Sequence, residues 1–296
     1  MIGARDACEQ DNELRCRVGK AMRRALDAAG AGPQTTISGF LLGPVQSGLM
    51  ILHRRDTIVT DGRPCSLTFR EQSGDLLNAF RSRGALCAPL RLRADGSRIC
   101  VVNAHANAES ADHWGGLLFG EGLPSVPRPS VSRRRQLAEL FSFARQMTRE
   151  ARVVVCGDLN SSPELGEIPA DQHGFVDVTS MTAKKRREAA GLASEDCRLD
   201  VTVDGCRPWL ATWDGTRNQL VSSGWHSEGS DACTQLDYIF SSGVSGLVPE
   251  DVSLALDDMT MPLSDHFGLL ARFAVRKHRS EVHTPAPQRL EPEWGI

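Results

Sequence analysis

The residues with the clearest potential for chemistry are Asp158 and Asn160, which follow the apolar run Val153–Cys156. That run has a strong strand preference. Because alternate residues of a strand share a face, we expect both polar side chains on one side of the strand end. A carboxylate suits a hard divalent cation, and an amide can donate to a phosphate oxygen. The alternative for this stretch alone is a strand followed by an ordinary Asx-turn.

Two further polar residues occur in or beside apolar strands. His105 follows the strand expected at 99–103, and an imidazole in such a place is more often a satisfied structural histidine. Asp237 interrupts the apolar run Leu236–Phe240. A buried carboxylate without a partner is costly, so Asp237 should face a positive charge or a hydrogen-bond donor.

Asp265 and His266 lie side by side before an apolar strand. Neighbours in a strand point to opposite faces, so the two should have different roles. One would meet a metal or a phosphate, and the other would be oriented by an acid such as Asp237. Together these residues have the chemistry of metal-assisted phosphodiester hydrolysis, with Mg²⁺ (or Mn²⁺) as the cofactor and no serine or cysteine nucleophile.

Strands and helices interleave along the chain without a regular βαβ repeat, which predicts an α+β domain with mixed sheets. Asp95-Gly96 indicates a hairpin turn between two of the strands. We expect one domain over residues 1–276 and a disordered tail over 277–296. Expected helices cover 13–29 and 132–148, with 180–196 either helix or loop, and expected strands cover 35–42, 48–53, 85–92, 99–103, 152–156, 175–178, 235–241 and 269–275.

Composition sets limits on the function. The chain has 296 residues with 41% hydrophobic content, enough for a sizeable core. A formal net charge of -3 argues against a strong overall attraction to nucleic acid or acidic lipid, although a local patch remains open. The nine cysteines show no repeated C-x-x-C spacing, so we expect them reduced and mostly buried. No apolar run is long enough to span a membrane and no signal-peptide pattern is visible, which favours a cytoplasmic protein. We predict no obligate protein partner.

Five segments, in this order, resemble the endonuclease/exonuclease/phosphatase superfamily with the DNase I-like fold. They are Ser47–Leu52, Val102–His105, Gly157–Asn160, Leu236–Phe240 and Ser264–His266. The resemblance extends to about residue 275. It implies a four-layered α+β sandwich, in which two packed mixed β-sheets are flanked by helices.

The resemblance also implies roles for the polar residues. His266 would be the catalytic base, supported by Asp237. His105 would bind or polarise the phosphate, and Asp158 and Asn160 would position the nucleophile and the phosphate.

The metal ligands implied by the resemblance are Asp265 and Asp6. Family members begin with a strand that ends in asparagine, followed by a strand whose glutamine-glutamate ending supplies the main ligand. Here Met1–Cys8 aligns with the second strand, so that Arg5 replaces the glutamine and Asp6 the glutamate, and the first strand is missing. A shorter carboxylate and a competing positive charge would both weaken the site. Either the domain is N-terminally incomplete or the protein has lost catalysis.

Within the superfamily the chain looks most like neutral sphingomyelinases. The reasons are the Ser47–Leu52 stretch, Thr212-Trp213-Asp214 before the Leu-Asp-Tyr strand, and Leu263–His266. The implied substrate is a sphingomyelin-like phospholipid. An inactive homologue that binds a phosphorylated ligand, and a nuclease acting on nucleic acid, remain as alternatives.

Other residues have both a functional and a structural interpretation. The basic runs Arg133–Arg135 and Lys184–Arg187 could contact phosphate or the surface of a membrane, although such runs are more often solvated faces. Trp114 and Phe119 could contact a lipid or sugar leaving group, or pack locally.

Overall fold

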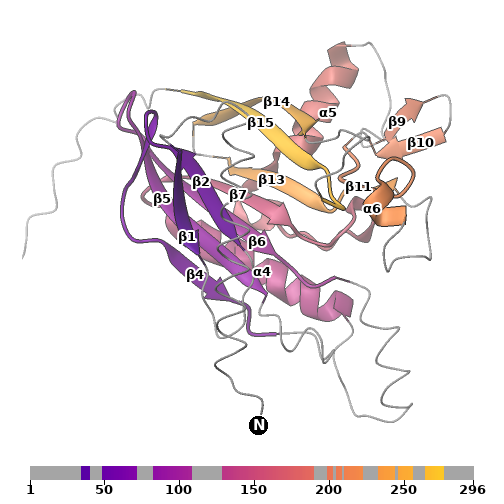
Figure 1. Cartoon of the computed structure of the whole chain (residues 1–296), viewed down its shortest axis with the longest axis horizontal. Helices are drawn as coiled ribbons and strands as arrows, with labels where there is room; N and C mark the ends of the chain where they lie inside the picture. Colours follow the sequence, from indigo (N-terminus) through magenta and orange to yellow (C-terminus); the bar gives the residue numbers. More distant parts are fainter. Residues whose placement is uncertain are drawn as a thin grey trace, which may run out of the picture.

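The structure is a computed structural model that describes residues 35–40, 49–71, 83–108, 129–189, 199–202, 205–208, 210–222, 233–243, 246–255 and 264–276. The described chain forms two layers of β-sheet, with helix α4 on the outer face of one layer (Figure 1). This arrangement is the predicted α+β sandwich with mixed sheets. The expected helix 13–29 and the expected tail 277–296 lie outside the described residues.

The larger layer is a seven-stranded sheet with the order β3-β5-β6-β7-β13-β8, in which β4 also pairs with β5. Strands β6 and β7 run parallel, and the other pairs are antiparallel. The strands are β3 Ile58–Thr60, β4 Cys65–Thr68, β5 Gly84–Leu92, β6 Arg98–His105, β7 Arg152–Asp158, β8 Phe175–Asp177 and β13 Asp237–Ser242.

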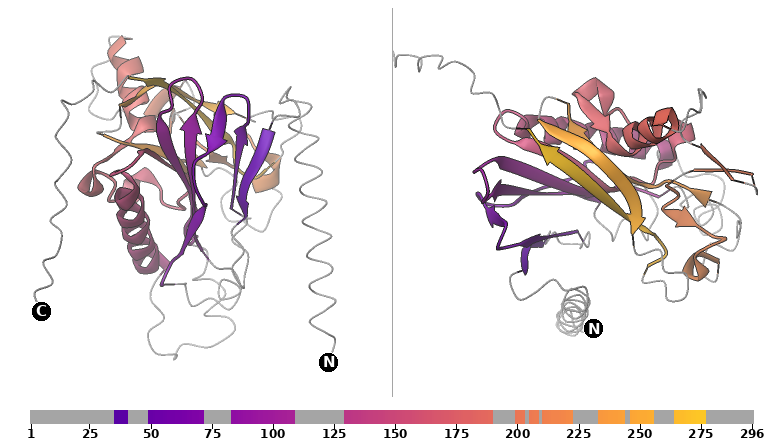
Figure 2. Two further views of the ribbon diagram at one scale, coloured as in Figure 1. Left: turned by 90° about the vertical axis from the view of Figure 1, so that its left-hand side faces the viewer. Right: turned by 90° about the horizontal axis from the view of Figure 1, so that it is seen from above.

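The second layer consists of two antiparallel ladders that lie over one face of this sheet (Figure 2). One pairs β1 Thr35–Phe40 with β2 Met50–Arg54, and the other pairs β14 Leu247–Ala255 with β15 Gly268–Val275. Apolar side chains of β2 pack on those of β5, and those of β14 and β15 pack near Ile239 of β13. Burial of these apolar contacts holds the two layers together.

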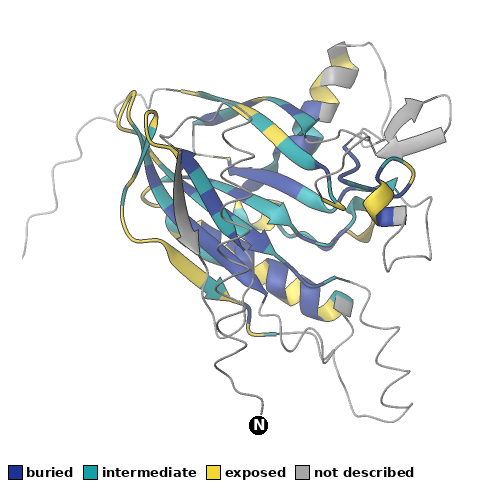
Figure 3. Ribbon diagram, in the orientation of Figure 1, coloured by how far each residue is buried: buried dark blue, intermediate teal, exposed yellow. Residues whose placement is uncertain are grey.

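Helix α4, Pro129–Met147, connects β6 to β7 and covers the opposite face of the main sheet. Leu137, Leu140, Phe141 and Ala144 recur at helical spacing and are fully buried. Figure 3 shows this buried stripe next to an exposed one on the same helix. Because α4 is a crossover between parallel strands, it brings the carboxyl ends of β6 and β7 to the same edge of the sheet.

The remaining elements lie around the edges of the two layers. Helix α5, Val178–Ala189, contacts β13 and β14. No described helix is long and apolar enough to cross a membrane. The shorter elements are η2 Pro163–Leu165, η3 Asp171–His173, β9 Leu199–Thr202, β10 Gly205–Pro208, β11 Trp213–Asp214, α6 Gln219–Ser222 and β12 Cys233–Thr234.

Most of the expected strands within the described residues are confirmed, and the differences have physical causes. Strands β6 and β7 each extend two residues further than expected, to His105 and Asp158, because the ladder between them continues to that pair. Strand β14 was not predicted, since Pro249 and two acidic residues obscure its apolar pattern. A shift of register between Pro249 and Asp251 forms a bulge that accommodates the proline.

Candidate active site

Three of the predicted site residues lie in one row across the main sheet. His105 pairs with Asp158 across β6 and β7, and Asp158 pairs with Asp237 across β7 and β13. The apolar neighbours Val154 and Ile239, which share their strand faces, pack towards β15. Since alternate residues share a face, the row faces the space between the two sheet layers. A cleft of about 350 Å³ reaches Asp237 from this side.

His105 contacts both an acid and an arginine. Its Nε2 lies 3.3 Å from Asp158 Oδ2, and Arg83 Nη1 lies 2.6 Å from its Nδ1. A guanidinium can only donate, so Arg83 is the donor group in this contact. Burial alone would raise the pKa of Asp158, but the hydrogen bond from His105 and the charges of His105 and His266 together hold that pKa below its ordinary value.

The second imidazole of the site, His266, is held by Asp237. Nδ1 of His266 lies 2.7 Å from Asp237 Oδ2, with about a fifth of each side chain exposed. Burial would lower the pKa of His266, but the hydrogen bond with Asp237 and the charges of Asp237, Asp158 and Asp265 raise it to about 9. The expected pairing of the imidazole with this acid is therefore present in the structure.

A tight turn after β7 places Asn160. Its backbone has a left-handed φ of 48°, its N–H donates to Asp158 Oδ1 at 2.9 Å, and its Nδ2 donates to Ala106 O at 3.1 Å. Asn160 therefore lies in an Asx-turn that begins at Asp158, which was the alternative given for this stretch, and strand alternation does not explain its position. Gly157, at φ 136°, precedes the turn, and a Cβ there would lie 2.0 Å from Ala104 O. Only glycine permits this close approach of β7 to β6.

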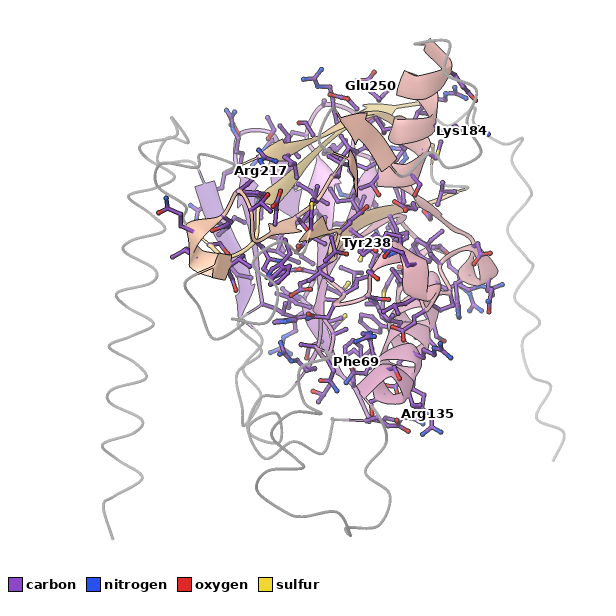
Figure 4. The ribbon with its side chains drawn as sticks, turned by 90° about the vertical axis from the view of Figure 1, so that its right-hand side faces the viewer. Phe69, Arg135, Lys184, Arg217, Tyr238 and Glu250 are labelled. Carbon is purple, nitrogen blue, oxygen red and sulfur yellow. The ribbon has the colours of Figure 1, made fainter. Side chains whose placement is uncertain are left out.

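A buried network beneath the turn holds it in place. The hydroxyl of Tyr238 donates to Ser161 O at 2.7 Å, and Ser161 Oγ donates to Glu167 Oε2 at 3.1 Å. Arg133 of α4 donates to the same carboxylate oxygen at 2.6 Å, and both side chains of this ion pair are almost fully buried. Figure 4 shows Tyr238 in the interior of the molecule, among the side chains of the surrounding strands. The network links α4 to the residues that follow Asn160.

Thr212 connects the two segments that carry Asp237 and His266. Its Oγ1 accepts from the N–H groups of Leu236 and Asp237 at 3.0 and 3.1 Å, and its carbonyl accepts from Phe267 N–H at 2.7 Å. The Thr212-Trp213-Asp214 stretch therefore contributes to the site through the side-chain hydroxyl and the carbonyl of Thr212, a buried residue.

The donor set suits a divalent cation. Asp158, Asp237 and His266 each offer a ligand atom, and these atoms lie within 4.8 Å of one another. The two carboxylates fit an ion such as Mg²⁺, which prefers oxygen ligands and keeps several waters when bound. Asp265, a predicted ligand, is exposed and accepts from Ser264 Oγ at 3.2 Å; it does not belong to this group in the described part of the chain. Asp6 lies outside the described residues.

Sequence reasoning did not identify Arg83 as a site residue. The hairpin turn at Asp95-Gly96 fixes the register of β5 against β6, which places Gly84 opposite His105. Counting from that turn places Gly84 opposite the histidine, but the alternation of side chains would direct Arg83 to the other face of the sheet, so no local signal predicts its contact with His105.

The first basic run is not a uniformly solvated face, because Arg133 is buried against Glu167 while Arg135 is exposed and paired with Glu71. Lys184 of the second run is exposed on α5 (Figure 4). Trp114 and Phe119 lie outside the described residues.

The fold and this row of acids and imidazoles define the class of the protein. The chain belongs to the Endonuclease/Exonuclease/phosphatase family, whose model matches residues 12–266. No curated protein matches the sequence.

Solved structures confirm the DNase I-like fold. D. rerio TDP2 complexed with a single strand DNA product is 17% identical to this chain, with a TM-score of 0.51. The match covers 86% of this chain and 90% of the D. rerio chain. TDP2 from C. elegans is 18% identical to this chain, with a TM-score of 0.52. The match covers 86% of this chain and 60% of the C. elegans chain.

Proposed function

We propose that this chain is a divalent-metal-dependent phosphodiesterase. The observation that carries the proposal is the row His105, Asp158 and Asp237, with His266 Nδ1 2.7 Å from Asp237 Oδ2. Family membership supports it, because the family is described as endonucleases, exonucleases and phosphatases, all of which hydrolyse phosphate esters.

Asp158 and Asp237 would hold the ion, with Asp265 and Asp6 as the further ligands that the family resemblance implies. When bound, Mg²⁺ or Mn²⁺ supplies a Lewis acid for a phosphoryl oxygen and a positive charge that lowers the pKa of nearby groups. Proton transfer and phosphate binding are the roles of the chain's own side chains.

His266 is the proposed base. Asp237 occupies its Nδ1, which leaves Nε2 to take a proton from the attacking water. A pKa of about 9 keeps His266 protonated at neutral pH, so it can act as a base only when a positive charge nearby lowers that pKa. The proposal therefore makes metal binding and base function interdependent.

His105, Arg83 and Asn160 are the proposed phosphate-binding groups. Arg83 is 8% exposed and brings a permanent positive charge next to His105. The amide nitrogen of Asn160 carries two hydrogens, of which one is donated to Ala106 O, so the other can meet a phosphoryl oxygen. Donors fixed in advance stabilise the charge that develops on those oxygens.

For the substrate, we propose a sphingomyelin-like phospholipid first, on the sequence resemblance to neutral sphingomyelinases. A nuclease acting on short single strands is the second candidate, because a protein of the same fold, D. rerio TDP2, is described in complex with a single strand DNA product. The third candidate is an inactive homologue that binds a phosphorylated ligand, supported by Arg5 and Asp6 at the positions of the family's glutamine and glutamate.

The test begins with bis(4-nitrophenyl) phosphate, a chromogenic phosphodiester, in buffers with Mg²⁺ or EDTA. We expect turnover with Mg²⁺ only, and its loss in His266→Gln. The matched control is His173→Gln. His173 stacks on Phe141 of α4, which covers the face of the main sheet opposite the site residues. Sphingomyelin in mixed micelles and a short DNA strand then separate the first two candidates. A folded chain that binds Mg²⁺ and turns over none of the three substrates would support the third candidate.

A further inference from the structure

Three cysteines lie next to one another on the face of the main sheet that α4 covers. Cys65 of β4 is the direct cross-strand partner of Cys87 of β5. Cys100 of β6 is diagonal to Cys87, being opposite Pro89, and the two Sγ atoms lie 2.8 Å apart. This cluster lies on the opposite face of the sheet from the row of site residues.

The three thiols form a series from the surface to the core. Cys65 is exposed, and its strand lies at the exposed edge of the sheet (Figure 3). Cys87 and Cys100 are 1% and 2% exposed and belong to the core beneath α4. An oxidant as large as a disulfide can therefore meet Cys65 but not the inner pair.

We propose that Cys87 and Cys100 are an oxidisable dithiol, and that Cys65 is the thiol through which an external disulfide reaches them. The oxidant is a small-molecule disulfide such as oxidised glutathione. The phosphodiester hydrolysis proposed above does not involve these three cysteines.

The oxidation proceeds in three exchange steps. The Cys65 thiolate attacks oxidised glutathione, which gives a mixed disulfide and releases one glutathione thiol. Cys87 then attacks Sγ of Cys65, forms a Cys65–Cys87 disulfide and releases the second glutathione. Cys100 finally attacks Sγ of Cys87, forms the Cys87–Cys100 disulfide and restores the Cys65 thiol. The two cysteines lose two electrons and two protons, and the glutathione disulfide becomes two thiols.

The protonation of the thiols sets the rate. Although Cys65 is accessible to solvent, the surrounding atoms partly desolvate its thiol and raise its pKa to about 11, so little thiolate exists at neutral pH. The hydrogen bond with Cys100 and burial raise the pKa of Cys87 as well. The thiolate is the nucleophile. At pH values below the pKa of Cys65, each increase of one pH unit should therefore raise the rate of oxidation about tenfold.

The bond would link β5 to β6, the strand that ends at His105. It would close the hairpin whose turn is Asp95-Gly96 and so fix the register that places Gly84 beside His105. An oxidised chain should resist unfolding more than a reduced one.

The experiment treats the folded full chain with excess oxidised glutathione at about pH 8.5, where more thiolate is present. Free thiols are then alkylated and the disulfides are mapped by peptide mass spectrometry. We expect a Cys87–Cys100 disulfide with a mass loss of about 2 Da and no remaining glutathione adduct. Cys65→Ser, at an exposed position, should fold normally and form this bond at least about tenfold more slowly. Cys233→Ser is the matched control and should behave as the parent chain.

Two results would overturn the proposal. Complete glutathionylation of Cys65, with Cys87 and Cys100 remaining as free thiols that the alkylating agent then modifies, would show that the inner pair is not oxidisable by this route. Equal rates in the Cys65→Ser variant and the parent chain would show that Cys65 is not the entry point. In the Cys100→Ala variant we expect oxidation to stop at the Cys65–Cys87 disulfide, and a mixed glutathione disulfide on Cys87 would contradict the order of steps.

Discussion

Replacing Asp237 by asparagine should change the protonation of His266 more than any other single substitution at the site. Asp237 provides both the hydrogen bond at 2.7 Å and the largest of the charges that raise the pKa of His266 to about 9. The difference between 9 and the ordinary 6.5 corresponds to about 3 kcal/mol. In Asp237→Asn the charges of Asp158 and Asp265 remain, but so does the burial that lowers the pKa, so we expect the pKa of His266 to fall well below 9.

The sign of the effect on stability follows from the direction of the pKa change. A raised pKa in the folded state stabilises the fold fully below about pH 6.5, and this contribution is lost as the pH rises through about 9. The free energy of unfolding of the parent chain should therefore fall by up to about 3 kcal/mol across that interval. In Asp237→Asn the decrease over this range should be much smaller.

The assay is an NMR titration of the imidazole signals in metal-free buffer with EDTA, with His266→Gln used to assign the resonance. Asp265→Asn is the matched control, because that carboxylate is exposed and contributes the smallest of the named charges. It should lower the pKa only slightly. A midpoint near 6.5 in the parent chain, or one near 9 in Asp237→Asn, would refute the reasoning.

Three further predictions concern the supports of the site. Gly157→Ala should destabilise the fold by more than about 3 kcal/mol in urea unfolding, because its Cβ would lie 2.0 Å from Ala104 O; Gly96→Ala, with nothing within 4 Å, should cost about 1 kcal/mol. Glu167→Gln should cost about 3 to 5 kcal/mol in the same measurement, since it leaves Arg133 charged and buried; a cost below about 1 kcal/mol would contradict this view of the pair. Asp158→Ala should abolish saturable Mg²⁺ binding measured by isothermal titration calorimetry, whereas equal binding in the variant and the parent chain would place the ion elsewhere.

The sequence predicted the parts of the site that depend on local pattern. Asp237 in an apolar strand required a partner, and His266 is that partner. The hairpin around Asp95-Gly96 was also predictable, because its turn chemistry is specific. Periodicity places Arg133 four residues before Leu137, on the buried stripe of α4, so its burial could have been inferred.

Other features depend on contacts between segments that are distant in the sequence. The position of Arg83 beside His105 depends on the register of β5 against β6. The left-handed turn at Asn160 depends on an acceptor, Ala106 O, that lies 54 positions earlier in the chain. Strand β14 needed the bulge after Pro249 to be recognised, and that bulge is defined only by the register of β14 against its partner strand β15.

The most direct test of the proposed function is the rate of phosphodiester hydrolysis as a function of Mg²⁺ concentration in the parent chain and in His266→Gln. We predict saturable, Mg²⁺-dependent turnover of bis(4-nitrophenyl) phosphate in the parent chain, and a decrease of at least about a hundredfold in the variant, which should still bind Mg²⁺ saturably. Equal rates in the two proteins, or turnover that persists in EDTA, would contradict the account of the site.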